Sequence, residues 1–139
     1  MLNERQEFVE RITPEIVESV KALVALNQPC YAPSILVAIA YLQTGYGTKQ
    51  SFRFTESYFS IPYHITNLCH QPIEEQVSQY CKYIYNMLKG YDLSFKGTMK
   101  IFETKDFGTP MFRQSLRNIV KEYNLTVFDR CVFPKEYDD

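Results

Sequence analysis

One polar side chain, Gln43, stands at the end of a stretch that is otherwise apolar. The residues from Pro33 to Leu42 are apolar at nearly every position, and Gly45 and Gly47 follow the glutamine closely. A helix that begins at a proline and ends at a glycine would carry Gln43 to its C-terminal end. An amide there donates and accepts hydrogen bonds but cannot deliver a proton near neutral pH. The position therefore suits hydrogen bonding and not acid catalysis.

The cysteines and histidines form no recognisable chemical motif. The cysteines are Cys30, Cys69, Cys81 and Cys131, and they contain no Cys-x-x-Cys pair. Cys69 and His70 are adjacent, but neighbouring loop residues seldom point at each other, and no third group is evident that would orient them as a nucleophilic pair. We expect reduced, partly buried thiols, no metal site and no cofactor.

The run Ala40-Tyr41-Leu42-Gln43-Thr44-Gly45-Tyr46-Gly47 resembles a motif of the bacterial glucosaminidase family. This family comprises endo-β-N-acetylglucosaminidases and the flagellar rod-cap muramidases, and its pattern there is Ala-x-Leu-Glu-Ser-Gly-Trp-Gly. The glutamate is the family's catalytic acid. The resemblance therefore puts Gln43 at the position of the acid and Tyr46 at that of the tryptophan.

Two further blocks follow in the family's order, so that the resemblance covers about residues 8–123. Ser57-Tyr58-Phe59-Ser60-Ile61 is similar to Asn-Leu-Phe-Gly-Ile, which helps to shape the family's groove, with only Phe59 and Ile61 matching outright. Phe107-Gly108-Thr109-Pro110 looks like Tyr-Ala-Thr-Asp-Pro with the aspartate deleted. The resemblance implies that Phe107 lacks the hydroxyl of an active-site tyrosine. Both changes conserve volume, so a pocket could keep its shape without its reaction.

Hydrolysis of a glycosidic bond ordinarily needs two carboxyl groups across that bond. The family's second carboxylate lies in a β-rich lobe, and the corresponding residues 62–71 are too few to form a full one. The acids that could reach a groove are Glu56, Glu74, Glu75, Glu103 and Asp106. Glu74 and Glu75 follow Pro72 and suit a helix N-terminus instead. Glu56 is then the substitute acid to test, and no catalytic position of the family is intact.

Aromatic residues are abundant, with eleven tyrosines and ten phenylalanines. Sugar rings present apolar C–H faces that pack on aromatic rings, so a glycan groove would use such residues. The predicted substrate-binding residues are Gln43, Tyr46, Tyr58, Phe59, Tyr63 and Phe107. Each aromatic ring taken singly also suits ordinary packing in the core or on the surface.

Hydrophobic periodicity and capping signals predict a mainly α chain. We expect helices from Thr13-Pro14 to about Leu26, from Pro33 to the glycines at 45 and 47, from Pro72 to Gly90, and from Thr109-Pro110 to Asn124, with a shorter piece around Met99 and Phe102. Residues 48–71 lack periodicity and predict loops with short extended pieces, and the tail after about residue 128 predicts irregular structure. Together with the resemblance, this favours one domain over residues 1–139, lysozyme-like, with a cleft and a reduced β-lobe.

Charge and hydropathy argue against two kinds of partner. The net charge is −1 with acids and bases interspersed and no basic block, which disfavours nucleic acid. No stretch approaches the length of a membrane span, and the N-terminus lacks the apolar region of a secretory signal. We expect synthesis in the cytoplasm without a signal peptide, with the protein virion-associated or delivered to the cell envelope by a larger machine.

Three functions remain open from the sequence. The first is a catalytically degenerate glucosaminidase-like protein that binds a peptidoglycan glycan strand or serves, with protein partners, as a structural component of an assembly such as a phage tail. The second is an active peptidoglycan glycoside hydrolase in which Gln43 replaces a native glutamate by engineering or is bypassed by Glu56. The third is an unrelated helical interaction domain.

Overall fold

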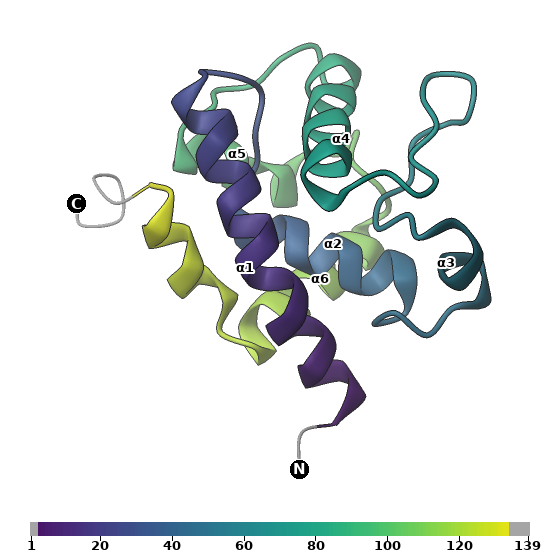
Figure 1. The fold of residues 1–139 in the computed structure, drawn as a ribbon. Coiled ribbons are helices and arrows are strands. Elements are labelled where there is room, and N and C mark those ends of the chain that lie inside the picture. The colour runs from purple at the N-terminus through teal and green to yellow at the C-terminus, as the bar shows by residue number, and fades with distance from the viewer. Residues whose placement is uncertain (1–2, 134–139) are drawn as a thin grey trace.

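The computed structural model describes residues 3–133 and is mainly helical (Figure 1). Its elements are α1 (Glu4–Ala25), α2 (Pro33–Thr44), α3 (Gln50–Thr55), α4 (Ile73–Met87), α5 (Phe95–Met99), the 3₁₀ helix η1 (Lys100–Glu103), α6 (Pro110–Glu122) and the 3₁₀ helix η2 (Leu125–Cys131). No strand occurs among the described residues. The expectation of a mainly α chain is therefore confirmed.

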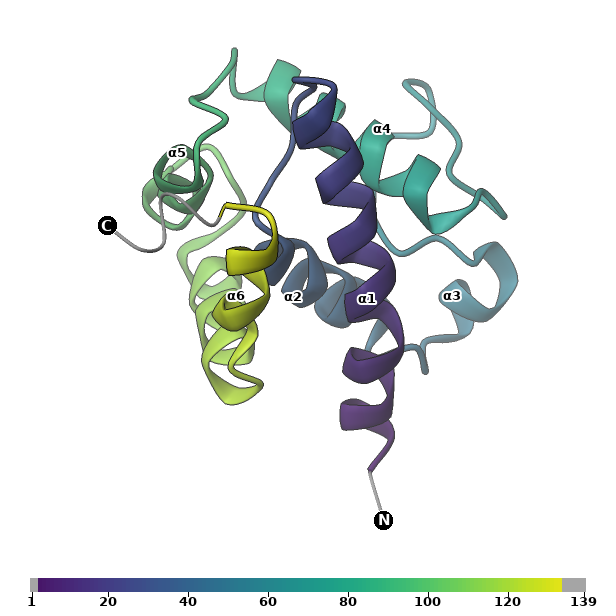
Figure 2. The same ribbon diagram turned by 60° about the vertical axis from the view of Figure 1, so that its left-hand side comes forward.

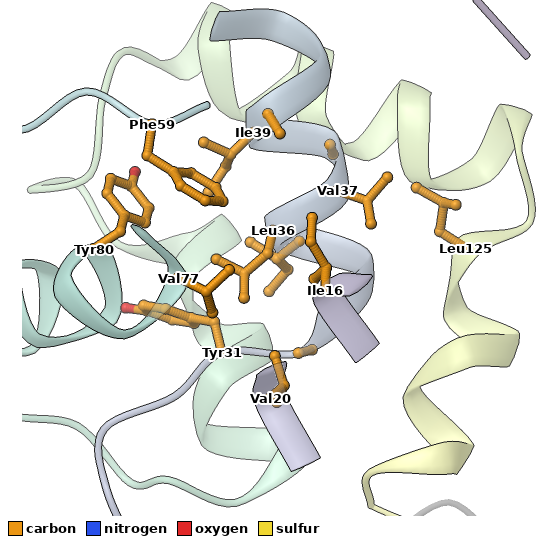
Figure 3. Close-up of a cluster of buried hydrophobic side chains, with 14 of the residues drawn as sticks. Ile16, Val20, Tyr31, Leu36, Val37, Ile39, Phe59, Val77, Tyr80 and Leu125 are labelled. Carbon is orange, nitrogen blue, oxygen red and sulfur yellow. The ribbon is translucent and has the colours of Figure 1, made fainter. Parts of the chain in front are cut away.

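Helix α2 forms the centre of the molecule. Every residue from Pro33 to Tyr41 is buried, because the segment is apolar on nearly all sides and other helices surround it. It packs against α1, α6 and η2. In both ribbon views α1 crosses α2, and in Figure 2 α3 and most of α4 lie to the right of α1, with α5, α6 and η2 to its left (Figures 1 and 2). Side chains from α1, α2 and α4 meet in one core, among them Ile16, Leu36 and Val77 (Figure 3).

Helix α1 begins ten residues earlier than its most obvious sequence signal, so the predicted start at Thr13-Pro14 is wrong. Asn3 caps the helix, and its side-chain oxygen accepts a hydrogen bond of 2.8 Å from the backbone N–H of Gln6. Pro14 lies inside the helix, where it cannot donate to the carbonyl of Glu10. Glu10 is exposed, so water can satisfy that carbonyl. The interior proline is tolerated because its neighbours Ile12 and Ile16 are fully buried.

The remaining helix predictions agree with the structure. Helix α2 spans Pro33 to Thr44, and Gly45 follows it in the left-handed conformation with φ 56°. The Thr109 side chain caps α6 by accepting a 3.0 Å hydrogen bond from the N–H of Phe112. Helix α4 starts directly after Pro72, and the short piece around Met99 and Phe102 is α5 followed by η1. The cap-and-proline signals were therefore reliable except at Pro14.

Three expectations about irregular segments are wrong for the described residues: the loops at 50–55, the β-lobe and the irregular tail after about residue 128. Residues 50–55 form the helix α3 where loops with extended pieces were predicted, and the predicted β-lobe has no strand within residues 3–133. Phe52 of α3 packs edge-on against Tyr58, with ring centroids 4.9 Å apart, and this contact joins the short helix to the segment that follows it. The tail continues as η2 to Cys131 and buries Val132 and Phe133, while residues 134–139 lie outside the described part. None of the described helices is both long and apolar enough to cross a membrane.

Candidate functional site at the end of the central helix

The turn after α2 fixes the direction in which Gln43 points. The N–H of Tyr46 donates to the carbonyl of Tyr41 over 2.8 Å, which closes the helix end. The neighbouring Thr44 is fully buried, and its hydroxyl donates to the carbonyl of Ala40 and accepts from the N–H of Gly47. Because Thr44 faces the core, the adjacent Gln43 lies at the boundary of the core and is only half-buried.

Gln43 lines a pocket of about 280 Å³, here called the amide pocket. Its other lining residues are Ser51, Phe52, Thr55, Ser57, Phe59, Ser60, Ile61, Tyr63, Thr66, Asn67, Leu68 and Cys69. Most of them belong to the loop between α3 and α4. The side-chain amide of Gln43 has no hydrogen-bond partner among residues 3–133. Its donors and its acceptor are therefore free to bind a ligand.

The amide pocket is electrically neutral. None of the described residues that line it carries a carboxylate, an ammonium or a guanidinium group. Its polar members are hydroxyls and amides, and its apolar members include the rings of Phe52, Phe59 and Tyr63. The Tyr63 ring is 75% exposed, and its hydroxyl accepts a 3.1 Å hydrogen bond from the side chain of Asn67. Such a pocket can hydrogen-bond an uncharged polar ligand and pack on its apolar faces.

A second pocket of about 490 Å³, here called the acidic pocket, adjoins the first. It is lined by Arg11, Glu15, Phe52, Glu56, Tyr58, Gln71, Pro72, Ile73 and Glu74. Phe52 lines both pockets. Residues 55–59 alternate between them: positions 55, 57 and 59 line the amide pocket, and positions 56 and 58 line the acidic pocket. Burial raises the pKa of the Tyr58 hydroxyl above its ordinary value, so the ring stays neutral.

The structure separates the predicted site residues into several groups. Gln43, Phe59 and Tyr63 line the amide pocket, and Glu56 and Tyr58 line the acidic pocket. Phe59 is itself buried, so little of its surface is open to the pocket. Glu56 is exposed, and its carboxylate lies 3.3 Å from Nδ1 of His70. It therefore points away from the Gln43 side of the loop.

Two predicted site residues lie outside both pockets. The Tyr46 ring faces α1, where the guanidinium of Arg5 lies 5.0 Å from the ring centroid. Phe107 is only 4% exposed and packs against Phe112, with ring centroids 5.9 Å apart. Its backbone carbonyl accepts a 2.9 Å hydrogen bond from Arg113. Phe107 thus occupies the core beside α6 and is not brought together with Gln43.

The other candidate groups are spread over the molecule. Glu74 and Glu75 lie in the first turn of α4, as expected, and Glu103 and Asp106 are exposed near η1. None of the four described cysteines forms a disulfide, and Cys30 and Cys81 are buried. Within residues 3–133 no three histidine, cysteine or acidic side chains lie close enough to hold a metal ion.

Gln76 was not expected to take part in the site. It is fully buried on α4 and hydrogen-bonds to backbone groups of the loop that lines the amide pocket. The sequence carries one signal for it, since position 76 lies between Ile73 and Val77 on the inward face of the helix. A polar residue on that face has to find partners inside the protein.

Comparison with models of known protein families, with curated proteins and with solved structures finds no match to this chain.

Proposed function

We propose that this protein is a catalytically silent relative of the bacterial glucosaminidases, with a lysozyme-like fold, and that it binds a peptidoglycan glycan strand in the amide pocket. In this proposal the protein belongs to a larger assembly, such as a phage tail or an envelope machine, that takes it from the cytoplasm to the cell wall. The family assignment rests on the three sequence blocks around Gln43, Phe59 and Phe107.

The observation that carries the proposal is the free amide of Gln43 in a neutral pocket. An N-acetylated sugar carries hydroxyl and amide groups and no net charge, so it matches a lining of hydroxyls, amides and rings. A half-buried amide without an internal partner contributes little to the fold. It can contribute to ligand binding, because a bound sugar would supply the hydrogen bonds that the protein does not.

The absence of acids in the amide pocket supports binding without hydrolysis. A glycosidase places two carboxyl groups on either side of the scissile bond. The amide pocket has no carboxylate among its described lining residues. Glu56, the predicted substitute acid, lines the neighbouring acidic pocket and pairs with His70. A sugar seated beside Gln43 would therefore meet hydrogen-bonding groups but no general acid.

Exposed apolar side chains near the pocket are consistent with a place in an assembly. Phe54 is 70% exposed and Ile65 is 54% exposed, and both belong to the segment that surrounds the amide pocket. Large apolar side chains that are exposed on the surface are common at protein interfaces. A partner protein on this side would hold the pocket against the polymer that it recognises.

A binding experiment with a matched variant tests the proposal. Purified protein is incubated with isolated sacculi, and soluble N-acetylglucosamine oligomers are titrated in by nuclear magnetic resonance. We expect retention on sacculi and shifts at Gln43, Tyr63 and Asn67, with about tenfold weaker affinity for Tyr63→Ala, which removes one stacking face. Tyr85→Ala, in a half-buried ring on α4 outside the amide pocket, is the control. No retention and no shifts would sink the proposal.

A gain-of-function test separates silent binding from lost catalysis. Gln43→Glu restores the acid of the family motif, and lysis of sacculi is then measured by release of reducing ends. We expect no lysis, because the second carboxylate is missing from the amide pocket. Sustained lysis by this variant, abolished by the further change Glu56→Gln, would establish an active hydrolase instead.

A further inference from the structure

The loop between α3 and α4 is closed at its base by backbone contacts. The N–H of His70 donates to the carbonyl of Thr55 over 2.8 Å, so residues 57–70 leave and return at almost the same place. This loop supplies nine of the thirteen residues that line the amide pocket, from Ser57 to Cys69. The shape of the pocket therefore depends on how the loop is held.

One side chain from α4 bonds to both ends of the loop. The Nε2 atom of Gln76 donates to the carbonyl of Glu56 and to the carbonyl of Gln71, each over 2.9 Å. Its Oε1 atom accepts from the N–H of Tyr58 over 2.8 Å. Both N–H groups and the oxygen of a single amide are thus used on the loop base.

The chemistry of these contacts is specific to an amide. Gln76 is fully buried, so its replacement by an apolar residue of similar length would leave two carbonyls and one N–H without partners. A glutamate of the same shape is acceptor-only when it is ionised, and it would face two carbonyl oxygens. Only glutamine has two donors and one acceptor in this geometry.

Beyond its base the loop has few anchors. Phe59 stacks on Tyr80 of α4, with ring centroids 4.8 Å apart and an interplanar angle of 16° (Figure 3). Leu68 is the other buried side chain of the loop. The residues from Pro62 to Ile65, between these two anchors, are exposed and include Tyr63. A conformational change at the base of the loop can therefore displace the residues that line the pocket, because few contacts hold the rest of the loop in place.

We infer that Gln76 is a positioning residue for the amide pocket: it fixes both ends of the 57–70 loop at once and so sets the distance between Gln43 on α2 and the loop residues that face it. This inference rests on the proposed function for its binding consequence. Its structural consequence, local control of the loop, stands independently of any ligand.

Hydrogen exchange with a matched control tests the inference. Gln76→Met is compared with Gln79→Met, one turn further along α4, where the side chain bonds only to Glu75 on the surface. We expect exchange at Tyr58 and His70 to accelerate about tenfold or more in Gln76→Met, with protection of α2 core amides such as Leu36 changing much less. The inference would be overturned if exchange protection fell equally at the loop and at α2. It would also be overturned if the two variants showed the same exchange rates.

The same pair of variants separates this inference from the proposed function. If wild-type protein binds N-acetylglucosamine oligomers, Gln76→Met should bind about tenfold more weakly and Gln79→Met unchanged. If wild-type protein binds no oligomer, the proposed function fails, and the exchange data alone decide the role of Gln76. Unchanged affinity in Gln76→Met with an opened loop would overturn the claim that Gln76 positions the pocket.

A pH series on Gln76→Glu supplies a readout that a general loss of stability would not give. Protonation gives the carboxyl one O–H donor, which can restore one of the two lost bonds. Loop protection in this variant should therefore recover when the pH falls from 7.5 to 5, while wild type shows no such recovery. Absence of recovery would overturn the inference.

If neither variant folds, hydrogen exchange measured on the folded wild-type protein tests the inference instead. We then expect Tyr58 and His70 to show equal protection, above that of Tyr63, because one opening event releases both. Unequal protection of Tyr58 and His70 would show that Gln76 does not hold both ends of the loop together.

Discussion

The two ends of α2 hold polar side chains in opposite ways. At the N-terminal end, the backbone N–H and the hydroxyl of Ser34 donate to the two carboxylate oxygens of Asp129, over 2.9 and 2.7 Å. Both residues are buried. At the C-terminal end, Gln43 has no partner among residues 3–133 and faces a pocket. One end of the helix is internally satisfied, and the other is left free.

This contrast separates a structural polar group from a binding one. Asp129 brings η2 onto the first turn of α2, where its carboxylate accepts from the free N–H of Ser34 and interacts favourably with the helix dipole. Removing it should change the fold. Removing the amide of Gln43 should change what the protein binds and leave the fold alone. Three measurements test this difference.

The largest effect is expected at Asp129. Asp129→Ala leaves two buried donors of Ser34 without acceptors, and we expect the free energy of unfolding at pH 5 to fall by about 2 to 4 kcal/mol. Asp106→Ala, at an exposed position, should stay within about 0.5 kcal/mol of wild type. Chemical denaturation measures both values. A loss at Asp129 no larger than that at Asp106 would remove the contrast between the two helix ends.

The pH dependence of stability should report the same carboxyl group. Burial raises the pKa of Asp129 from 3.8 to about 6, against the opposing effect of its bonds to Ser34. The native state then holds this proton more tightly than the unfolded state, so the contribution of Asp129 to stability is fully present below about pH 4 and is lost as the pH rises through about 6. The expected fall is about 2 to 3 kcal/mol relative to Asp129→Asn. The raised pKa of Asp129 would be contradicted if the free energy of unfolding of wild type, relative to that of Asp129→Asn, stayed constant or increased as the pH rises.

The smallest effect is expected at Gln43. Gln43→Ala should change the free energy of unfolding by less than about 0.5 kcal/mol, since no internal hydrogen bond is lost and alanine favours a helix. Thr44→Ala, at the adjacent buried position with two hydrogen bonds, should cost about 1 to 2 kcal/mol. A loss at Gln43 as large as that at Thr44 would mean that its amide supports the fold.

Local signals in the sequence were enough for most helices. Pro33 and Gly45 mark the bounds of α2, and Thr109-Pro110 marks the start of α6, because capping and the geometry of proline and glycine act over a few residues. The start of α1 was misplaced although Asn3 and Gln6 form a capping pattern. A proline at an exposed position can lie inside a helix whose buried face is strong enough.

The candidate site was predictable only in part. Gln43 could be placed from its own helix, Phe59 from the second sequence block, and Tyr63 from its position two residues after that block. The burial of Phe107 depends on packing against α6, which spacing does not reveal. The bond between Ser34 and Asp129 joins residues 95 positions apart, and the bonds of Gln76 depend on the loop returning to its start. Long-range polar pairs of this kind leave no periodic trace in a sequence.

The alternation of residues 55–59 between two pockets means that a single stretch of backbone is a wall common to both. A side chain moved by one position along this wall changes the pocket that it lines. Glu56→Ser combined with Ser57→Glu would place a carboxylate at a position that lines the amide pocket. Two neighbouring substitutions on one wall would therefore change the charge of the ligand that this pocket accepts.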